Sequence, residues 1–272
     1  MESVREHYNS QKGRNLEERK HTPNFNIRCF NNAMKRVLIK NTAEVEIDVL
    51  DIGIGKGGDL KKYENLRINK LYGLEISNLS LIEAVKRSRY FSLDYICRFK
   101  LIDCFGKSFD LERKFDLISC QFAFHYCFRS MEEYKITVEN ISRHLAVRGK
   151  FLITTPDSEE VLRRFKTNDT FNTYYKIENF KNSSSLIFGR SYSFTLISSV
   201  ESCEEYIVDC DQLISDLKKE NIFLIESSNF ADYIYDSDKK HTNKRLVRDF
   251  FALNSEEKDV ISFYKFMVFQ RR

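Results

Sequence analysis

The fold is decided by one short stretch, Val49-Leu50-Asp51-Ile52-Gly53-Ile54-Gly55-Lys56-Gly57-Gly58-Asp59. Its first four residues are mostly apolar and predict a strand. The glycines that follow predict a turn whose exposed backbone N–H groups allow a ligand to approach the main chain closely. A helical pattern begins at Asp59. Strand, glycine turn and helix in this order predict a ligand site at the carboxyl end of a sheet.

Strands and helical patterns alternate outward from this stretch. The apolar runs predict seven strands, at residues 47–52, 71–76, 98–102, 115–121, 150–155, 222–226 and 263–269. Helical patterns lie between them, at residues 59–63, 79–90, 131–145 and 212–220, the third of which opens with a capping box from Ser130 to Glu133. We therefore predict an α/β, Rossmann-like fold with a mostly parallel seven-stranded sheet and helices on both faces.

The regular alternation of strand and helix patterns ends after Pro156. A helix is expected at residues 157–166, followed by a polar stretch through 182–185 and two apolar-alternating runs, 186–196 and 205–209. These runs predict an antiparallel insertion. The basic run 238–245 is interpreted as a solvated loop, with a nuclear-import signal as the alternative.

The first forty residues are rich in Lys and Arg, and apolar periodicity starts only near Phe25. A helix is predicted from Phe30 to Ile39, with Asn31 and Lys35 on a face away from the core. We divide the chain into a basic segment with a helix that completes the site (1–40) and a catalytic domain (41–272) with an insertion at about 157–210.

Composition excludes several classes of protein. The chain has 272 residues, of which 42% are hydrophobic and 31% charged, as expected of a folded domain. The net charge of +4 is small for a general nucleic-acid binder, so any RNA contact should be local. The charged N-terminus and the absence of long apolar runs argue against secretion and membrane insertion. The seven cysteines form no zinc or disulfide pattern and are interpreted as reduced thiols.

Acidic residues near three strand ends distinguish between two ligands. The spacing of Gly53, Gly55 and Gly58 fits a dinucleotide fingerprint, with Glu75 in the place of the ribose-binding acid. However, Asp51 would repel a pyrophosphate and could bind the ammonium group of S-adenosylmethionine, and Asp103 could accept from an adenine amine. The pattern favours a methyltransferase over an NAD-dependent oxidoreductase, which stays an alternative.

Several motifs resemble the eukaryotic mRNA cap guanine-N7 methyltransferases. They are His7-Tyr8-Asn9, Phe30-Asn31-Asn32-Ala33-Met34-Lys35, the glycine stretch, Gln121-Phe122-Ala123-Phe124-His125-Tyr126, Pro156, Glu205-Tyr206 and Tyr264. Ala33, Ile54 and Glu75 stand where the family usually has Trp, Cys and Asp. The resemblance implies methyl transfer from S-adenosylmethionine to N7 of the guanine that caps mRNA.

The resemblance also assigns candidate site residues. Cofactor contacts are expected from Lys35, Asp51, Gly53, Glu75, Asp103, Gln121 and Tyr126. The cap guanine is expected against Phe122, His125, Pro156, Glu205 and Tyr264, with Glu205, His125 and Tyr264 orienting it. The triphosphate is expected near Asn31, Asn32, Lys56, Lys62 and Arg87. Guanine N7 carries a lone pair and no proton, so we predict no general base. We also expect no metal.

The same resemblance implies capped RNA as the substrate, a nuclear location and a monomer. It also suggests an RNA guanylyltransferase or the RNA polymerase II tail as partners. Two alternatives remain open besides the oxidoreductase. One is a methyltransferase that acts on another RNA, a protein or a small molecule, and the other is an RNA-binding module without turnover.

Overall fold

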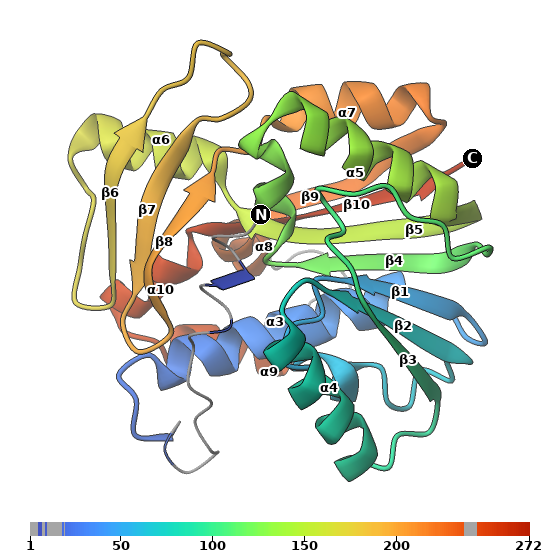
Figure 1. Ribbon diagram of the computed structural model, residues 1–272. Helices are drawn as coiled ribbons and strands as arrows, with labels where there is room; N and C mark the ends of the chain where they lie inside the picture. The colour runs from blue at the N-terminus through green and yellow to red at the C-terminus, as the bar shows by residue number, and fades with distance from the viewer. Residues whose placement is uncertain (1–4, 7–8, 10–17, 19, 237–243) are drawn as a thin grey trace.

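The computed structural model describes residues 5–6, 9, 18, 20–236 and 244–272. Within these ranges the chain forms a large sheet covered by helices and a smaller sheet beside it (Figure 1). The large sheet consists of β1 (Asp48–Ile52), β2 (Lys70–Glu75), β3 (Ile96–Leu101), β4 (Phe115–Gln121), β5 (Leu145–Pro156), β9 (Ile222–Asn229) and β10 (Tyr264–Arg271). Their order is β3-β2-β1-β4-β5-β10-β9. β10 runs antiparallel to its neighbours β5 and β9, whereas β1 to β5 pair in parallel.

Helices cover both faces of this sheet (Figure 1). The helices are α3 (Phe25–Thr42), α4 (Asn78–Tyr90), α5 (Met131–His144), α6 (Ser158–Thr167), α7 (Cys210–Lys219), α8 (Phe230–Tyr235), α9 (Lys244–Phe251) and α10 (Ser255–Ile261), with short 3-10 turns η1 (Leu60–Lys62) and η2 (Phe124–Arg129). None of the helices in the described ranges has the length and apolarity needed to cross a membrane.

Two hydrophobic cores lie on opposite faces of the sheet, because successive side chains of a strand point to opposite sides. Leu152 packs into the core that α3, α8 and α10 share, and its neighbours Phe151 and Ile153 pack into the core under α5 and α7. Strands covered on both faces read as nearly continuous apolar runs. The predicted Rossmann-like fold is confirmed.

A three-stranded antiparallel sheet stands beside the large one. It contains β6 (Tyr175–Lys181), β7 (Ser191–Leu196) and β8 (Val200–Tyr206), and it lies between α6 and α7 in the chain. The predicted antiparallel insertion is therefore confirmed, although its strands differ from the predicted runs. β6 was not predicted, because its alternation is short and ends in polar residues.

The residues from Leu186 to Arg190 do not form the strand that was predicted to begin there. The hydroxyl of Ser185 accepts hydrogen bonds from the backbone N–H groups of Ile187 and Phe188, at 3.3 and 3.0 Å. Such local side-chain bonds compete with strand pairing. The strand β7 accordingly starts only at Ser191.

Three further predictions need correction. The helix expected at 59–63 is the single 3-10 turn η1, and α8, α9 and α10 were not predicted. The capping box of α5 is half formed: the Ser130 hydroxyl accepts from the N–H of Glu133, whereas the Glu133 carboxylate pairs with Arg129. Of the basic run predicted to be a loop, residues 238–243 lie outside the described residues, and Lys244 and Arg245 begin α9.

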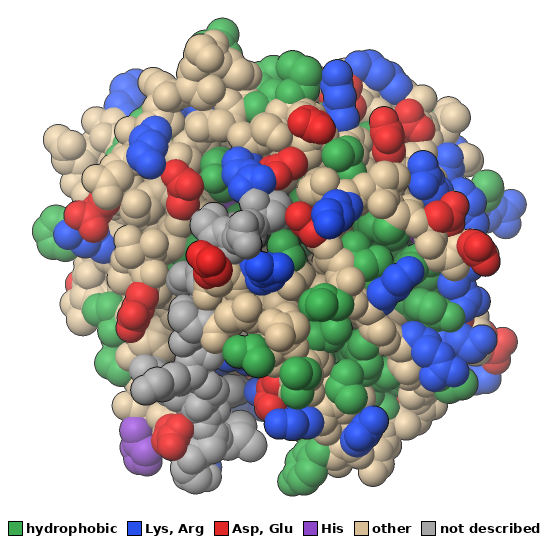
Figure 2. Space-filling view, in the orientation of Figure 1, with side chains coloured by type: hydrophobic (Ala, Val, Ile, Leu, Met, Phe, Trp, Pro, Cys, Tyr) green, Lys and Arg blue, Asp and Glu red, His purple; other side chains and the backbone are tan. Residues whose placement is uncertain are grey.

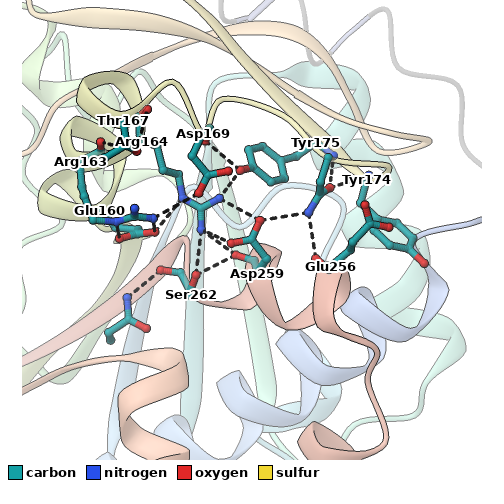
Figure 3. Close-up of polar contacts among 12 residues, drawn as sticks. Glu160, Arg163, Arg164, Thr167, Asp169, Tyr174, Tyr175, Glu256, Asp259 and Ser262 are labelled. Carbon is teal, nitrogen blue, oxygen red and sulfur yellow. Dashed lines mark hydrogen bonds and ion pairs between the residues drawn. The ribbon is translucent and has the colours of Figure 1, made fainter.

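A fully buried arginine ties the insertion to the large sheet (Figure 3). The guanidinium of Arg164, on α6, donates to both carboxylate oxygens of Asp259 on α10, at 2.7 and 3.1 Å, and to the hydroxyl of Ser262 at 2.9 Å. It also contacts the hydroxyl of Tyr175 on β6. α6 and β6 are thus fixed to the segment that leads into β10.

Acidic and basic side chains are interspersed over the face seen in Figure 2. This distribution agrees with the small net charge of +4. It gives no field of a single sign over that face, so contacts with an anionic partner depend on local groups.

Candidate functional site

Two neighbouring cavities lie at the carboxyl ends of the parallel strands. We call the first the strand-end cavity; its volume is about 290 Å³. It is lined by Lys35, Gly53, Ile54, Gly55, Lys56, Gly58, Asp59, Glu75, Ile76, Arg87, Ile102, Asp103, Cys104, Phe105, Gln121, Phe122, Ala123 and Tyr126.

We call the second the insertion cavity; its volume is about 230 Å³. It is lined by Arg28, Asn31, Asn32, Lys35, Phe122, His125, Tyr126, Pro156, Phe194, Leu196, Val200, Glu205 and Tyr264. Lys35, Phe122 and Tyr126 line both cavities, so the two spaces adjoin.

The glycine turn closes tightly over the end of β1. Gly53 has φ of +72°, and a Cβ there would lie 2.9 Å from the Cβ of Ala123. Both the conformation and the lack of space therefore require glycine at this position. The N–H groups of Gly53 and Ile54 donate to the carbonyl oxygen of Leu74 at 2.9 and 3.0 Å, which fixes the turn against β2.

Two acids hold loops at the rim of the strand-end cavity. The carboxylate of Glu75 accepts from the N–H groups of Gly55 and Ser77, both at 2.8 Å. Burial raises the pKa of Glu75 in spite of these two donors. The carboxylate of Asp103 accepts from the N–H of Gly106 at 2.8 Å. Each carboxylate oxygen has a second lone pair, so both acids can still accept from a ligand.

Asp51 is buried and is not among the residues that line the cavity. Its Oδ2 atom has no hydrogen-bond partner in the part of the chain that the structure describes. Burial, reinforced by the negative charge of Asp59, raises the pKa of Asp51 well above its usual range. A buried acceptor without a partner is costly, and a cationic ligand group nearby would favour its charged form.

A buried ionic network lies under the shared wall of the two cavities. The ammonium of Lys35 contacts both carboxylate oxygens of Asp59, at 2.7 and 2.9 Å. Burial by itself would raise the pKa of Asp59, but the charges of Lys35 and Lys62 outweigh it and hold that pKa below its ordinary value. Lys35 is thereby held at the boundary between the cavities.

Lys62 does not line either cavity, although the sequence placed it near a phosphate. Its side chain is only 3% exposed, and its ammonium donates to Asp59 at 2.6 Å, to the Asn32 side chain at 2.9 Å and to the carbonyl of Gly58 at 3.1 Å. Burial lowers the pKa of Lys62 to about 8. Lys62 does not reach a cavity because η1 packs against α3 and turns this side chain inward to Asn32.

Glu205 and His125 meet in the insertion cavity as two buried ionisable groups. The Oε2 atom of Glu205 accepts from the hydroxyl of Tyr192 at 2.8 Å, and burial raises the pKa of Glu205 to about 7. Burial lowers the pKa of His125 to about 3, so its ring is neutral near pH 7. Neither ring nitrogen of His125 has a hydrogen-bond partner among the described residues. Both groups can therefore bind a polar ligand in the cavity.

Aromatic side chains form the apolar walls. The rings of Phe122 and Tyr264 meet edge to face, with centroids 4.8 Å apart, and Phe230 packs behind Phe122 at 6.1 Å. Phe122 has φ of +56°, an uncommon conformation for a bulky residue. This conformation turns the chain sharply off the end of β4 and sets the ring between the two cavities.

The structure brings together most of the residues that the sequence singled out. Those that line a cavity are Asn31, Asn32, Lys35, Gly53, Lys56, Glu75, Arg87, Asp103, Gln121, Phe122, His125, Tyr126, Pro156, Glu205 and Tyr264, and those that do not are Asp51 and Lys62. In the described residues, no group of three or more His, Cys, Asp or Glu could hold a metal ion.

Sequence reasoning missed Arg28, Tyr192 and the apolar wall of β7 and β8. Arg28 lies one helical turn before Asn31 and Asn32, so the spacing on α3 could have indicated it. Tyr192 pairs with Glu205 across β7 and β8, which only the strand register shows. No local signal marks Phe194, Leu196 or Val200 as cavity residues.

The order of the large sheet and the glycine turn at the end of β1 define an α/β protein of the Rossmann-like class. A protein from Pyrococcus horikoshii OT3, PH0226, has the same fold with a TM-score of 0.58 and 15% identity, over 96% of this chain and 100% of that one. An S-adenosylmethionine-dependent methyltransferase from Clostridium acetobutylicum aligns with a TM-score of 0.56 and 14% identity, over 89% of this chain and 90% of that one.

Sequence comparison identifies the family. Residues 1–272 match the mRNA (guanine-N(7))-methyltransferase domain, and the chain belongs to this family. The mRNA cap guanine-N(7) methyltransferase of Schizosaccharomyces pombe is 30% identical over 99% of this chain and 82% of its own length. The enzyme of the same name from Saccharomyces cerevisiae is 33% identical over 85% of this chain, which spans 58% of that relative. The predicted family is confirmed, and an NAD-dependent oxidoreductase is excluded.

Proposed function

We propose that this protein transfers the methyl group of S-adenosylmethionine to N7 of the terminal guanine of capped mRNA. The observation that carries this proposal is the junction of the two cavities at Lys35, Phe122 and Tyr126. A cofactor in one cavity and a base in the other would meet at that junction.

The strand-end cavity offers groups that match each part of the cofactor. Lys35 would bind the methionine carboxylate, and the unpartnered Oδ2 of Asp51 suits the ammonium group behind the glycine turn. Glu75 would accept from the ribose hydroxyls, and Asp103 from the adenine amine. The turn at Gly53, together with Gln121 and Tyr126, would complete the wall.

The insertion cavity offers a complement to guanine. The base presents two adjacent donors, N1–H and the N2 amino group, and the Glu205 carboxylate can accept both. The neutral ring of His125 can hydrogen-bond to the same base. Phe122, Pro156 and Tyr264 supply apolar and aromatic surface, which is how proteins hold an unstacked base.

From the bound guanine, the triphosphate would extend along the rim of both cavities. Lys56 and Arg87 line the strand-end cavity, and Asn31 and Asn32 line the insertion cavity. Lys62 would act through its bond to Asn32 instead of touching a phosphate directly.

When bound, S-adenosylmethionine supplies a methyl group already activated by its sulfonium. Guanine N7 has a free lone pair, so the residues around it have no proton to remove. Their work is to hold N7 in line with the methyl group, and such orientation can lower a barrier by about 7–11 kcal/mol. Glu205 would hold the base through polar contacts and Phe122 through apolar contacts. The buried acids would keep the site compatible with a cationic ligand.

The test is methyl transfer from labelled S-adenosylmethionine to RNA that ends in GpppG, beside ApppG-ended and uncapped RNA. We expect label only on N7 of the terminal guanine after digestion of the product. Label on another acceptor would contradict the proposed substrate. Binding of the cofactor without transfer to any RNA would favour a module without turnover.

We further propose that the protein acts in the nucleus as a monomer and works beside an RNA guanylyltransferase or the RNA polymerase II tail. The guanylyltransferase is supported by the chemistry, because the guanine cap must be added before its N7 can be methylated. Sedimentation of the purified protein, and its capture by a phosphorylated polymerase-tail peptide or by guanylyltransferase, test these points. Dimers or a lack of capture would contradict them.

A further inference from the structure

Thr154 lies on β5 and lines neither cavity, but it bonds to two residues that do. It is fully buried and pairs with Gln121 of β4 on one side and Phe266 of β10 on the other. This position places its hydroxyl directly under the point where β4 ends and the chain turns into Phe122.

The hydroxyl of Thr154 serves two residues at once. It donates to the Oε1 atom of Gln121 at 3.1 Å and accepts from the backbone N–H of Phe122 at 3.0 Å. The Nε2 atom of Gln121 in turn donates to the hydroxyl of Ser119 at 2.9 Å. A hydroxyl has one proton, so donation to Gln121 fixes its direction and leaves its lone pairs for Phe122. The bonds form one directed chain from Phe122 to Ser119.

This chain fixes one residue of each cavity. Gln121 lines the strand-end cavity, and its amide orientation is set at both ends by Thr154 and Ser119. Phe122 lines both cavities and holds a positive φ, which persists only when surrounding contacts determine it. Besides the Thr154 hydroxyl, the Phe122 N–H reaches the Thr154 carbonyl at 2.9 Å.

We propose that Thr154 is a positioning residue that couples the cofactor cavity to the guanine cavity. Its hydroxyl sets the Gln121 amide on one side and the Phe122 turn on the other, so that one buried group governs both. This inference rests on the proposed function, because it assigns the two cavities to S-adenosylmethionine and guanine.

The neighbouring residue provides a matched control. Thr155 is also fully buried on β5, but its Oγ1 has no hydrogen-bond partner among the described residues. Thr154→Val and Thr155→Val make the same chemical change at adjacent buried positions. Only the first removes hydrogen bonds.

The experiment measures dissociation constants of the full chain for S-adenosylhomocysteine and, separately, for GpppG, so that it does not depend on turnover. For Thr154→Val we expect both constants to rise about tenfold, because the buried Gln121 carbonyl oxygen loses its donor and the Phe122 N–H keeps only the Thr154 carbonyl of its two acceptors. For Thr155→Val we expect both to stay within about twofold. Melting temperatures of all variants show which of them are folded.

A second pair of variants makes the test independent of whether the valine variant folds. Thr154→Ser keeps the hydroxyl and Thr154→Ala lacks it, while both lack the methyl group. We expect Ser to bind both ligands as the wild type does and Ala to resemble Thr154→Val. Equal effects of Ser and Ala, equal effects of the two valine variants, or a change for one ligand alone would each overturn the coupling. If wild-type protein binds both ligands but methylates no GpppG-ended RNA, the proposed function fails and the coupling stands.

Discussion

The Nε2 atom of His125 lies 3.9 Å from the Oε1 atom of Glu205, yet the two side chains form no ion pair near neutral pH. Burial lowers the pKa of His125 to about 3 and raises that of Glu205 to about 7. Each group is thus biased toward its neutral form. A guanine that donates two hydrogen bonds to Glu205 would stabilise its ionised form and so lower the pKa of Glu205.

Binding of the cap should therefore depend on pH through Glu205. Only the ionised carboxylate accepts both guanine donors, and its pKa is about 7. We expect the dissociation constant for GpppG to be nearly constant above pH 8 and to rise about tenfold for each pH unit below 7. Titration calorimetry from pH 5.5 to 8.5 measures it. Glu205→Gln should flatten the profile, and an unchanged profile in this variant would assign the pH dependence to another group.

The same residue should reduce stability at high pH. The native protein holds the Glu205 proton to about pH 7, whereas the unfolded chain releases it near 4.5. The native state therefore loses stability relative to the unfolded chain as pH rises between these values. From pH 5 to pH 8 the unfolding free energy of wild type should fall by up to about 3 kcal/mol more than that of Glu205→Gln. Urea denaturation at both pH values tests this.

The control for that experiment is Glu201→Gln, on the same strand. The side chain of Glu201 is exposed, so its carboxylate stays in water in both states. We expect the pH dependence of its unfolding free energy to match that of wild type. A difference from wild type as large as that of Glu205→Gln would show that burial of Glu205 is not the cause.

Asp59→Asn should destabilise the protein strongly. The change leaves the nearly buried ammonium of Lys62 without its anionic partner, and breaking such a pair typically costs about 3–5 kcal/mol. Affinity for S-adenosylhomocysteine should also fall, because Lys35 loses the contact that holds it. The surface pair of Glu46 and Arg67 has the same 2.7 Å separation as Lys35 and Asp59 but is more than 60% exposed. Glu46→Gln should cost less than about 1 kcal/mol, and a similar loss in both variants would contradict the role of burial.

Arg164→Met should loosen the insertion and weaken guanine binding. It leaves Asp259 and Glu160 without the buried guanidinium, at an expected cost of about 3 kcal/mol. Because Arg164 also packs on Phe263, next to Tyr264, we expect the GpppG dissociation constant to rise while that for S-adenosylhomocysteine changes little. Arg163→Met removes a half-exposed guanidinium from the adjacent position and serves as the control. Equal losses of GpppG affinity in the two variants would disprove the specific role of Arg164.

The local sequence was sufficient to predict those elements whose hydrophobic pattern matches their surroundings in the fold. The run from Val49 to Ile52 is apolar except for Asp51, as expected of a strand covered on both faces, and Gly53 is required by its positive φ. It was insufficient where side chains satisfy the backbone instead of a strand partner, as Ser185 does before β7. Short helices such as α8 and α10 depend on packing more than on periodicity.

The candidate site divides in the same way. The sequence by itself determined the glycine turn, the acids near the strand ends and the motif residues around Phe122, because turn geometry and strand ends follow from local pattern. Only the tertiary structure decided that Lys62 points inward to Asn32, that Tyr192 supports Glu205 and that the Thr154 hydroxyl bonds to both Gln121 and Phe122. These are contacts between distant segments in a low-dielectric interior, where register and burial set both partner and charge, and no local pattern encodes them.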